Sequence, residues 1–323
     1  MHRRQMLTAA AASVLVGPTV WAQGKYPQRP ITLVVPTAPG GSTDFTARLL
    51  AEPLSRALGQ PVIVDNKPGA SGNIGNKYVA RAAADGYTLL VSYSGYHVGN
   101  PHLFKQAGWD PISDFVPVAM LTRAPQVIAA RQDLPATNLK ELIAFARTNP
   151  GKINYASSGS GSIQHIAGEL FRQLTGTLIT HIPYKGSGPA VQDLLGGQVD
   201  LFITTPAGVV SQIQAGRLKG IAVTSKQRLP SLAHVPTAAE SGLDGYELDS
   251  WFALYAPAGT PADIVQLLNG EVNKILASPE TRRKAEDSGT SVEQMTPQQL
   301  GAFTRKELDY WGRVIKNAKI TLE

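Results

Sequence analysis

The 323-residue chain contains no cysteine, so we expect neither a disulfide framework nor a lipid-modified cysteine. Aromatic residues make up only 7% of the chain, and its basic residues are scattered singly rather than in runs. Nucleic-acid binders typically carry basic stretches interleaved with rings, so no nucleic acid is expected as a partner. The six histidines show no metal-ligand spacing, and neither a metal nor another cofactor is expected.

Catalytic signatures are also missing. The chain has no G-x-S-x-G elbow, no G-x-x-x-x-G-K-[ST] phosphate loop and no H-E-x-x-H motif. Ser162, His165 and Asp200 can be combined on paper into a triad, but any serine-rich chain allows such combinations. We therefore expect no catalytic residue, and we keep a secreted hydrolase using Ser162 and His165 as an alternative.

Residues 1–22 have the pattern of a signal peptide. Arg3-Arg4 lies in a basic start, Leu7–Val16 is apolar, and Val20-Trp21-Ala22 is typical of a cleavage site. The apolar run is shorter than the roughly 20 residues that a membrane span needs. We expect export across the cytoplasmic membrane by either the Sec or the twin-arginine route, followed by release as a freely soluble protein.

Strands and helices alternate along the first third of the chain, which predicts an α/β fold with a mostly parallel sheet. The expected elements are strand Ile31–Val35, a helix capped by Ser42 or Thr43 and reaching Leu58, strand Pro61–Asp65, helix Asn73–Ala84 and strand Tyr87–Val91. Pro53 predicts a kink or an early break in the first helix, near Ala51.

The same pattern returns after Lys152 and predicts a second α/β lobe. Two strand-like runs, Phe115–Leu121 and Pro125–Ala130, are joined through Thr122-Arg123-Ala124 and indicate a crossing between domains; Ser250–Ala256 indicates the return. At 323 residues the chain is long enough for two cores. We expect lobe 1 over 24–123 and 236–323, lobe 2 over 124–235, and an interdomain ligand cleft between them.

Glycine- and hydroxyl-rich loops follow several of the expected strands. Ala38–Ser42 precedes a helix, where free backbone N–H groups and the positive helix end suit a small anion, and Asp44 would stabilise that end. Ser157–Ser162 and His165 open a second helix, with a flexible connector as the alternative reading. Tyr184 precedes Lys185–Gly188, and Thr204-Thr205-Pro206 ends another strand. Because ligands bind beyond the carboxyl ends of strands, these loops are expected to face one cleft.

Long segments of the chain resemble one protein family. YPQRPITLVVPTAPGGSTD, VIVDNKPGASGNIG, DGYTLL, NYASSGSGSIQHIAGELF, HIPYKGSGPAVQDLLGGQVDLF and WFALYAPAGTP are similar to the Bug/TctC family, the periplasmic substrate-binding components of tripartite tricarboxylate transporters. The resemblance implies a type II periplasmic-binding-protein fold, a carboxylate ligand, and a monomer in the periplasm. Its partners would be the membrane subunits of such a transporter, or else a receptor that senses the same solute.

The resemblance also implies where the ligand binds. Family members often read Pro-(Phe/Tyr)-x-x-Gly-Gly in the first loop, whereas position 37 is threonine here, which favours a bulkier or more polar solute. Together with the loops above, the expected ligand-binding residues are Thr37, Ala38, Pro39, Gly40, Gly41, Ser42, Asp44, Ala70, Gly72, Ser94, Ser157, Ser158, Gly159, Ser162, His165, Tyr184 and Thr204.

Overall fold

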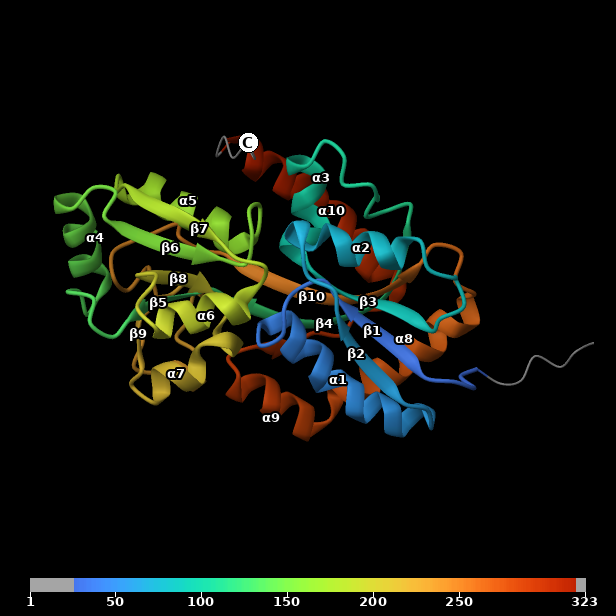
Figure 1. Ribbon diagram of the computed structural model, residues 1–323. Helices are drawn as coiled ribbons and strands as arrows, with labels where there is room; N and C mark the ends of the chain where they lie inside the picture. The colour runs from blue at the N-terminus through green and yellow to red at the C-terminus, as the bar shows by residue number, and fades with distance from the viewer. Residues whose placement is uncertain (1–25, 318–323) are drawn as a thin grey trace, which may run out of the picture.

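Two separate sheets organise residues 26–317, the part of the chain that the computed structural model describes (Figure 1). The expected signal peptide, residues 1–22, lies outside the described residues. Within 26–317, no helix is both long and apolar enough to cross a membrane.

The first sheet has the strand order β11-β4-β10-β3-β1-β2. Its strands are β1 (Ile31–Val35), β2 (Val62–Asn66), β3 (Thr88–Tyr93), β4 (Phe115–Pro125), β10 (Asp249–Pro257) and β11 (Ser291–Val292). β1 pairs in parallel with β2 and β3, while β10 runs antiparallel to β3 and β4. The helices that follow or flank these strands are α1 (Ser42–Leu58), α2 (Asn73–Ala80), α3 (Asn100–Leu103), α8 (Ala262–Ala277), α9 (Pro279–Asp287) and α10 (Pro297–Asn317).

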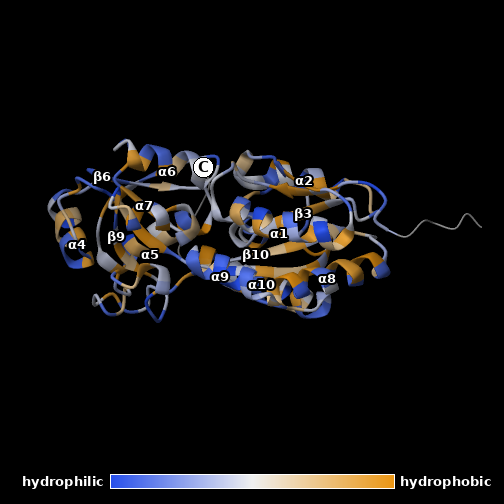
Figure 2. Cartoon of the chain, turned by 90° about the horizontal axis from the view of Figure 1, so that it is seen from below, coloured by the Kyte–Doolittle hydropathy of each residue, from blue (hydrophilic) through white to orange (hydrophobic). Residues whose placement is uncertain are grey.

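Alternate residues of β1 face opposite layers of this lobe, as the two-residue period of a strand requires. Ile31 and Leu33 pack in one apolar cluster with residues of α1 and α8. Val34 belongs to another cluster, which includes residues of α2 and α10. The sheet is therefore covered on both faces, and Figure 2 shows the apolar residues concentrated on the strands and on the inward sides of the helices.

The second sheet has the order β7-β6-β8-β5-β9. Its strands are β5 (Val127–Arg131), β6 (Ile153–Ser157), β7 (Ile179–Pro183), β8 (Leu201–Thr204) and β9 (Leu218–Val223). β6 is parallel to β7 and β8, and β5 is antiparallel to β8 and β9. Helices α4 (Leu139–Thr148), α5 (Ile163–Thr175), α6 (Ser187–Leu195) and α7 (Val210–Gln214) complete this lobe.

The chain passes between the sheets twice, and the two connections are bonded to each other. Gln126 joins β4 to β5, while residues 224–248 lead from β9 to β10. The Gln126 N–H donates to Thr224 Oγ1 at 2.8 Å, and the Thr224 N–H donates to the Gln126 carbonyl at 2.9 Å. Short helical turns complete the loops: η1 (Ala70–Gly72), η2 (Gly95–Gly99), η3 (Pro206–Gly208) and η4 (Pro230–Leu232).

Three local predictions differ from the structure. The expected break near Ala51 is wrong, because α1 continues through Pro53 to Leu58 while Ala51 and Leu54 stay buried in the core. α2 ends at Ala80 rather than Ala84, since the chain turns where the Ala82 N–H donates to the Val79 carbonyl. Thr122–Ala124 is not a loop but the end of β4, where Thr122 pairs with Phe252 of β10.

Candidate functional site

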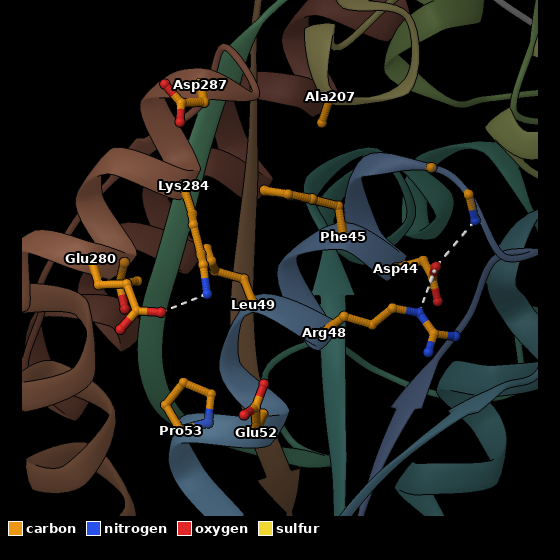
Figure 3. A pocket seen from close by; sticks show the side chains of 13 residues that line it. Asp44, Phe45, Arg48, Leu49, Glu52, Pro53, Ala207, Glu280, Lys284 and Asp287 are labelled. Atoms are coloured by element: carbon orange, nitrogen blue, oxygen red, sulfur yellow. Dashed lines mark hydrogen bonds and ion pairs between the residues drawn. The ribbon is translucent and has the colours of Figure 1, made fainter. Parts of the chain in front are cut away.

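Helix α1 begins without a capping side chain. Gly41 occupies its N-cap position, and Gly40 before it has a φ of +86°, which favours glycine. Asp44 folds back so that one carboxylate oxygen accepts from the Gly40 N–H at 3.1 Å and from Arg48 Nε at 3.0 Å (Figure 3). Its other oxygen accepts from Asn66 Nδ2 at 3.1 Å. The Asp44 carboxylate thus shapes the loop, and it lines a groove between α1 and α9 rather than the cavity between the lobes.

Helix α5 begins with its own polar network. Ser162 Oγ accepts from the His165 N–H at 3.3 Å, and the Gly161 N–H donates to His165 Nδ1 at 3.1 Å. The His165 ring stacks on that of His181, with centroids 4.0 Å apart, and His181 Nε2 lies 2.6 Å from Ser157 Oγ. Burial lowers the pKa of His181 to about 3, so this ring is neutral at pH 7. These side chains maintain the shape of the loop.

A cavity of about 10 Å³ lies where the two lobes meet. Three helices start at its wall: α1 at Ser42, α5 next to Gln164, and α6 at Ser187. None of the described residues that line it is charged, so hydroxyls, an amide and helix ends dominate its electrostatics. The lining consists of Thr37, Gly41, Ser42, Thr43, Tyr93, Ser158, Gln164, Ser187, Thr205 and Phe252.

Two tyrosines of the first lobe bond to the second lobe beside this cavity. Tyr93 Oη donates to Gln164 Oε1 at 2.7 Å and accepts from the Ile163 N–H at 2.9 Å, an amide at the start of α5 that has no partner within its helix. Tyr96 Oη donates to the Ser158 carbonyl at 2.5 Å. Both rings are buried, and burial raises the pKa of Tyr96 to about 12.

The loops of the two lobes also contact each other directly. Ser42 Oγ lies 2.5 Å from Thr205 Oγ1, and the Ala38 N–H donates to the Lys185 carbonyl at 3.2 Å. The Pro39 carbonyl approaches Gly188 so closely that a Cβ there would lie 2.0 Å from its oxygen. The described arrangement is therefore a closed one.

The expected residues fall into two groups. Thr37, Gly41, Ser42 and Ser158 line the cavity, and Ala38, Pro39, Gly40, Gly72 and Gly159 lie in the loops that touch across the lobes. Other expected residues form hydrogen bonds outside the cavity. Ser94 Oγ accepts from the Trp251 N–H at 3.2 Å, and Tyr184 Oη donates to Asp193 at 2.6 Å. The remaining expected residues outside the cavity lining are Asp44, Ala70, Ser157, Ser162, His165 and Thr204.

The sequence pattern did not single out Thr43, Tyr93, Gln164 or Phe252. Tyr93 lies two residues beyond the predicted strand Tyr87–Val91 and ends β3 in the structure, Gln164 lies within α5, and periodicity alone gives neither residue a role. Only their positions near strand and helix ends, beside the expected loops, could have pointed to these residues. Thr205 lines the cavity where Thr204 was expected, since neighbouring residues at a strand end point to opposite sides.

The triad drawn from Ser162, His165 and Asp200 is not assembled. The His165 ring nitrogen Nδ1 accepts from Gly161, and Ser162 Oγ contacts the backbone N–H of His165 instead of its ring. Asp200 Oδ1 accepts from Arg131 Nε at 2.8 Å. The geometry therefore contradicts the alternative of a hydrolase built on these residues.

Comparison with known proteins agrees with this geometry. Residues 46–320 match the model of the family described as "Tripartite tricarboxylate transporter family receptor". The protein BugT of Bordetella pertussis is 40% identical over 299 residues, covering 92% of each chain. Rpa4515 of R. palustris, solved with adipate, is 40% identical with a TM-score of 0.89 over 92% of this chain and 99% of that one.

A second solved relative is MatC of Rhodopseudomonas palustris with bound malate, which is 35% identical with a TM-score of 0.85 over 90% of this chain and 100% of that one. These matches confirm the expected two-lobed periplasmic-binding-protein fold. The family comprises receptors rather than enzymes. The chain therefore belongs to the TctC/Bug family of periplasmic solute-binding proteins of tripartite tricarboxylate transporters.

Proposed function

We propose that this protein binds a small dicarboxylate in the cavity between its lobes and delivers it to the membrane subunits of a tripartite tricarboxylate-type transporter. The observation that carries the proposal is the convergence of three helix starts, from two lobes, on one cavity without charged side chains. Helix starts bind anions through backbone N–H groups and the helix dipole. The adipate and malate held by two relatives support a dicarboxylate as the ligand class.

Binding requires the lobes to separate first. A cavity of about 10 Å³ is comparable to the space of a single water molecule, far less than a dicarboxylate occupies. In the proposed cycle the open form exposes both sets of loops, and the ligand stabilises a closed form in which both sets reach it. A TctC protein from Polaromonas, solved with no ligand, is 31% identical but has a TM-score of only 0.63, which supports a variable lobe arrangement in the family.

The proposed moving units are residues 24–123 with 236–323 and residues 124–235. The two separate sheets support two units, although Ala124 and Pro125 still belong to β4 of the first sheet and Thr237 bridges to Val223 of the second. We place the protein in the periplasm, as a monomer, because the family consists of periplasmic receptors and residues 1–22 have a signal-peptide pattern. A sensor that passes the same solute signal to a receptor is the alternative, and loss of dicarboxylate uptake in cells without this protein would argue against it.

Within the cavity, Thr37 defines the proposed specificity. Its side chain is buried and its Oγ1 has no hydrogen-bond partner among the described residues. A buried hydroxyl without a partner costs free energy that a polar ligand group could recover. We therefore expect a hydroxylated dicarboxylate to bind more tightly than an unsubstituted one of the same length.

The test is a calorimetric titration with malate, succinate, adipate and the neutral 1,6-hexanediol. We expect saturable binding of at least one acid, and at about 100 times its dissociation constant a stabilisation of roughly 2.7 kcal/mol against unfolding. The diol should not bind. Equal stabilisation by diol and acids would contradict the anion site.

A matched pair of glycine variants locates the site. Gly41→Asp places a negative charge at the start of α1, and its repulsion of the acid should abolish binding. The added side chain also crowds the site, because a Cβ at Gly41 already lies 3.0 Å from Ser187 Cβ. Gly270→Asp adds the same charge where a Cβ meets nothing within 4 Å. If the two variants bind the acid equally well, the first loop is not part of the site.

A further inference from the structure

A second cavity, of about 390 Å³, lies between α5, α10 and the connection from β9 to β10. The two ends of the connection from β9 to β10 contribute to its wall, through Thr224–Lys226 and Glu247–Leu248, together with Asp249 at the start of β10. Helix α5 of the second lobe supplies Leu170, and α10 supplies Glu307 and Trp311. Its volume falls within the range of about 300–1,000 Å³ typical of small-molecule sites. It shares none of its lining residues with the cavity of the proposed carboxylate site.

The cations at this cavity already have acidic partners. Arg123 Nε lies 3.5 Å from Glu293 Oε2, and Lys226 Nζ lies 3.9 Å from Glu247 Oε2. Within residues 26–317, in contrast, no ion pair is formed by Asp249 or Glu307. The cavity therefore carries two carboxylates whose charge no paired cation offsets.

The environments of these two carboxylates differ. Asp249 is exposed at the mouth of the cavity and forms no hydrogen bond through its carboxylate within the described residues; partial desolvation raises its pKa despite the attraction of Arg123. Glu307 Oε2 accepts from Trp251 Nε1 at 2.9 Å and from Trp311 Nε1 at 3.2 Å. Both of these bonds reach the same oxygen, so Oε1 remains available to a further donor.

Aromatic and apolar surface surrounds the carboxylates. Tyr310 and Trp311 line the cavity with their rings in edge contact, 5.4 Å apart, and the Tyr310 side chain is 46% exposed. Leu170 and Leu248 add aliphatic wall. Aromatic faces attract cations, and more strongly once water is excluded.

From this juxtaposition we propose that the cavity is a second ligand site, for a small organic cation: an ammonium group on an apolar body. The ammonium would donate to Asp249 and Glu307 while the body packs on Trp311 and Leu170. This site is independent of the proposed carboxylate function, because it shares no lining residue with the cavity between the lobes.

The test is a titration of the protein with 2-phenylethylamine at pH 7 and low salt, without any carboxylate ligand. We expect one saturable site, and 2-phenylethanol, which has the same body without the charge, should bind at least about tenfold more weakly. No saturable amine binding, or equal binding of amine and alcohol, would overturn the proposal.

Charge-matched variants test where the amine binds. Asp249→Asn and Glu307→Gln should each weaken amine binding about tenfold, since each removes one charge and keeps the side-chain shape. Asp287→Asn removes the same charge in the groove between α1 and α9 and should leave amine binding unchanged. A loss of similar size in all three variants would mean that the amine responds only to net charge, and the assigned site would be wrong. Acid titrations of the same variants report separately on the carboxylate site.

Discussion

Tyr93→Phe should open the ligand-free protein. The hydroxyl of Tyr93 joins the lobes through two bonds, to Gln164 Oε1 and from the Ile163 N–H, and its ring is 2% exposed. Phenylalanine keeps the ring and its stacking on Phe252, at 5.7 Å between centroids, but loses both bonds. In the closed form the Ile163 N–H would then lose its partner, whereas in the open form water reaches it.

The substitution therefore raises the free energy of the closed form alone. A buried polar group that loses its partner costs about 1–3 kcal/mol, which corresponds to a shift of about 5–150-fold toward the open form. The assay is small-angle X-ray scattering of the ligand-free protein, with fluorescence energy transfer between one dye on each lobe as the second measure. We expect a larger radius of gyration and a longer distance between the dyes.

Tyr255→Phe is the matched control. Tyr255 is fully buried in the first lobe, and its hydroxyl lies 2.6 Å from Thr304 Oγ1 of the same lobe. This variant should lower the unfolding temperature without changing the distance between lobes. If Tyr93→Phe likewise lowers only the unfolding temperature, its hydroxyl does not hold the lobes together and the reasoning fails.

Three further predictions concern single sites. Thr205→Val should shift the ligand-free protein toward the open form by removing the bond to Ser42, which small-angle X-ray scattering checks, whereas Thr204→Val should raise the unfolding free energy by up to about 1 kcal/mol, because Thr204 Oγ1 is buried without a partner among the described residues, which calorimetry checks. Gly72→Ala should cost about 1–3 kcal/mol of unfolding free energy, since its Cβ would lie 2.1 Å from the Tyr96 ring; Gly176→Ala, also at positive φ but with open space, should cost less in the same thermal melts. His97 is buried against the Tyr255 ring and its folded pKa is about 3, below the ordinary 6.5, so an unfolded chain binds its proton first and stability should fall as pH drops from about 6.5 toward 3; His181 adds a similar fall, and denaturant titrations should show a loss by pH 5 that is about 2 kcal/mol smaller in His97→Phe than in the parent protein.

The helices and strands could be predicted because local patterns determine them. Ile31–Val35 is a five-residue, mostly apolar run, and α1 follows the two glycines as expected, although Gly41 rather than Ser42 or Thr43 occupies its N-cap position. The end of α2 could not be predicted, since its residues stay compatible with a helix beyond Ala80 and tertiary packing decides where the chain turns. The break predicted from Pro53 was wrong for the same reason, because the burial of Leu54 outweighs the loss of one backbone hydrogen bond.

The site was harder to predict than the fold, because its partners lie far apart in the sequence. Thr37, Gly41 and Ser42 could be found from the loop that contains them, but Tyr93 meets Gln164 across 71 residues and Ser42 meets Thr205 across 163. No local pattern encodes such a pairing. Ser94 shows the converse: the family resemblance implied a ligand contact there, but its hydroxyl accepts from the Trp251 backbone N–H.

These cross-lobe bonds also bear on ligand affinity. In the closed arrangement Tyr93 occupies the Ile163 amide and Thr205 occupies the Ser42 hydroxyl, two groups that the acid would use under the function we propose. A ligand therefore competes with the protein's own side chains, and its apparent affinity falls in proportion to the fraction of molecules that are open. If only about 1% are open, the apparent dissociation constant is about 100 times the intrinsic one. Tyr93→Phe, by raising the open fraction, should then tighten the binding of any acid that takes the Ile163 amide, and weaken the binding of one that leaves the tyrosine in place.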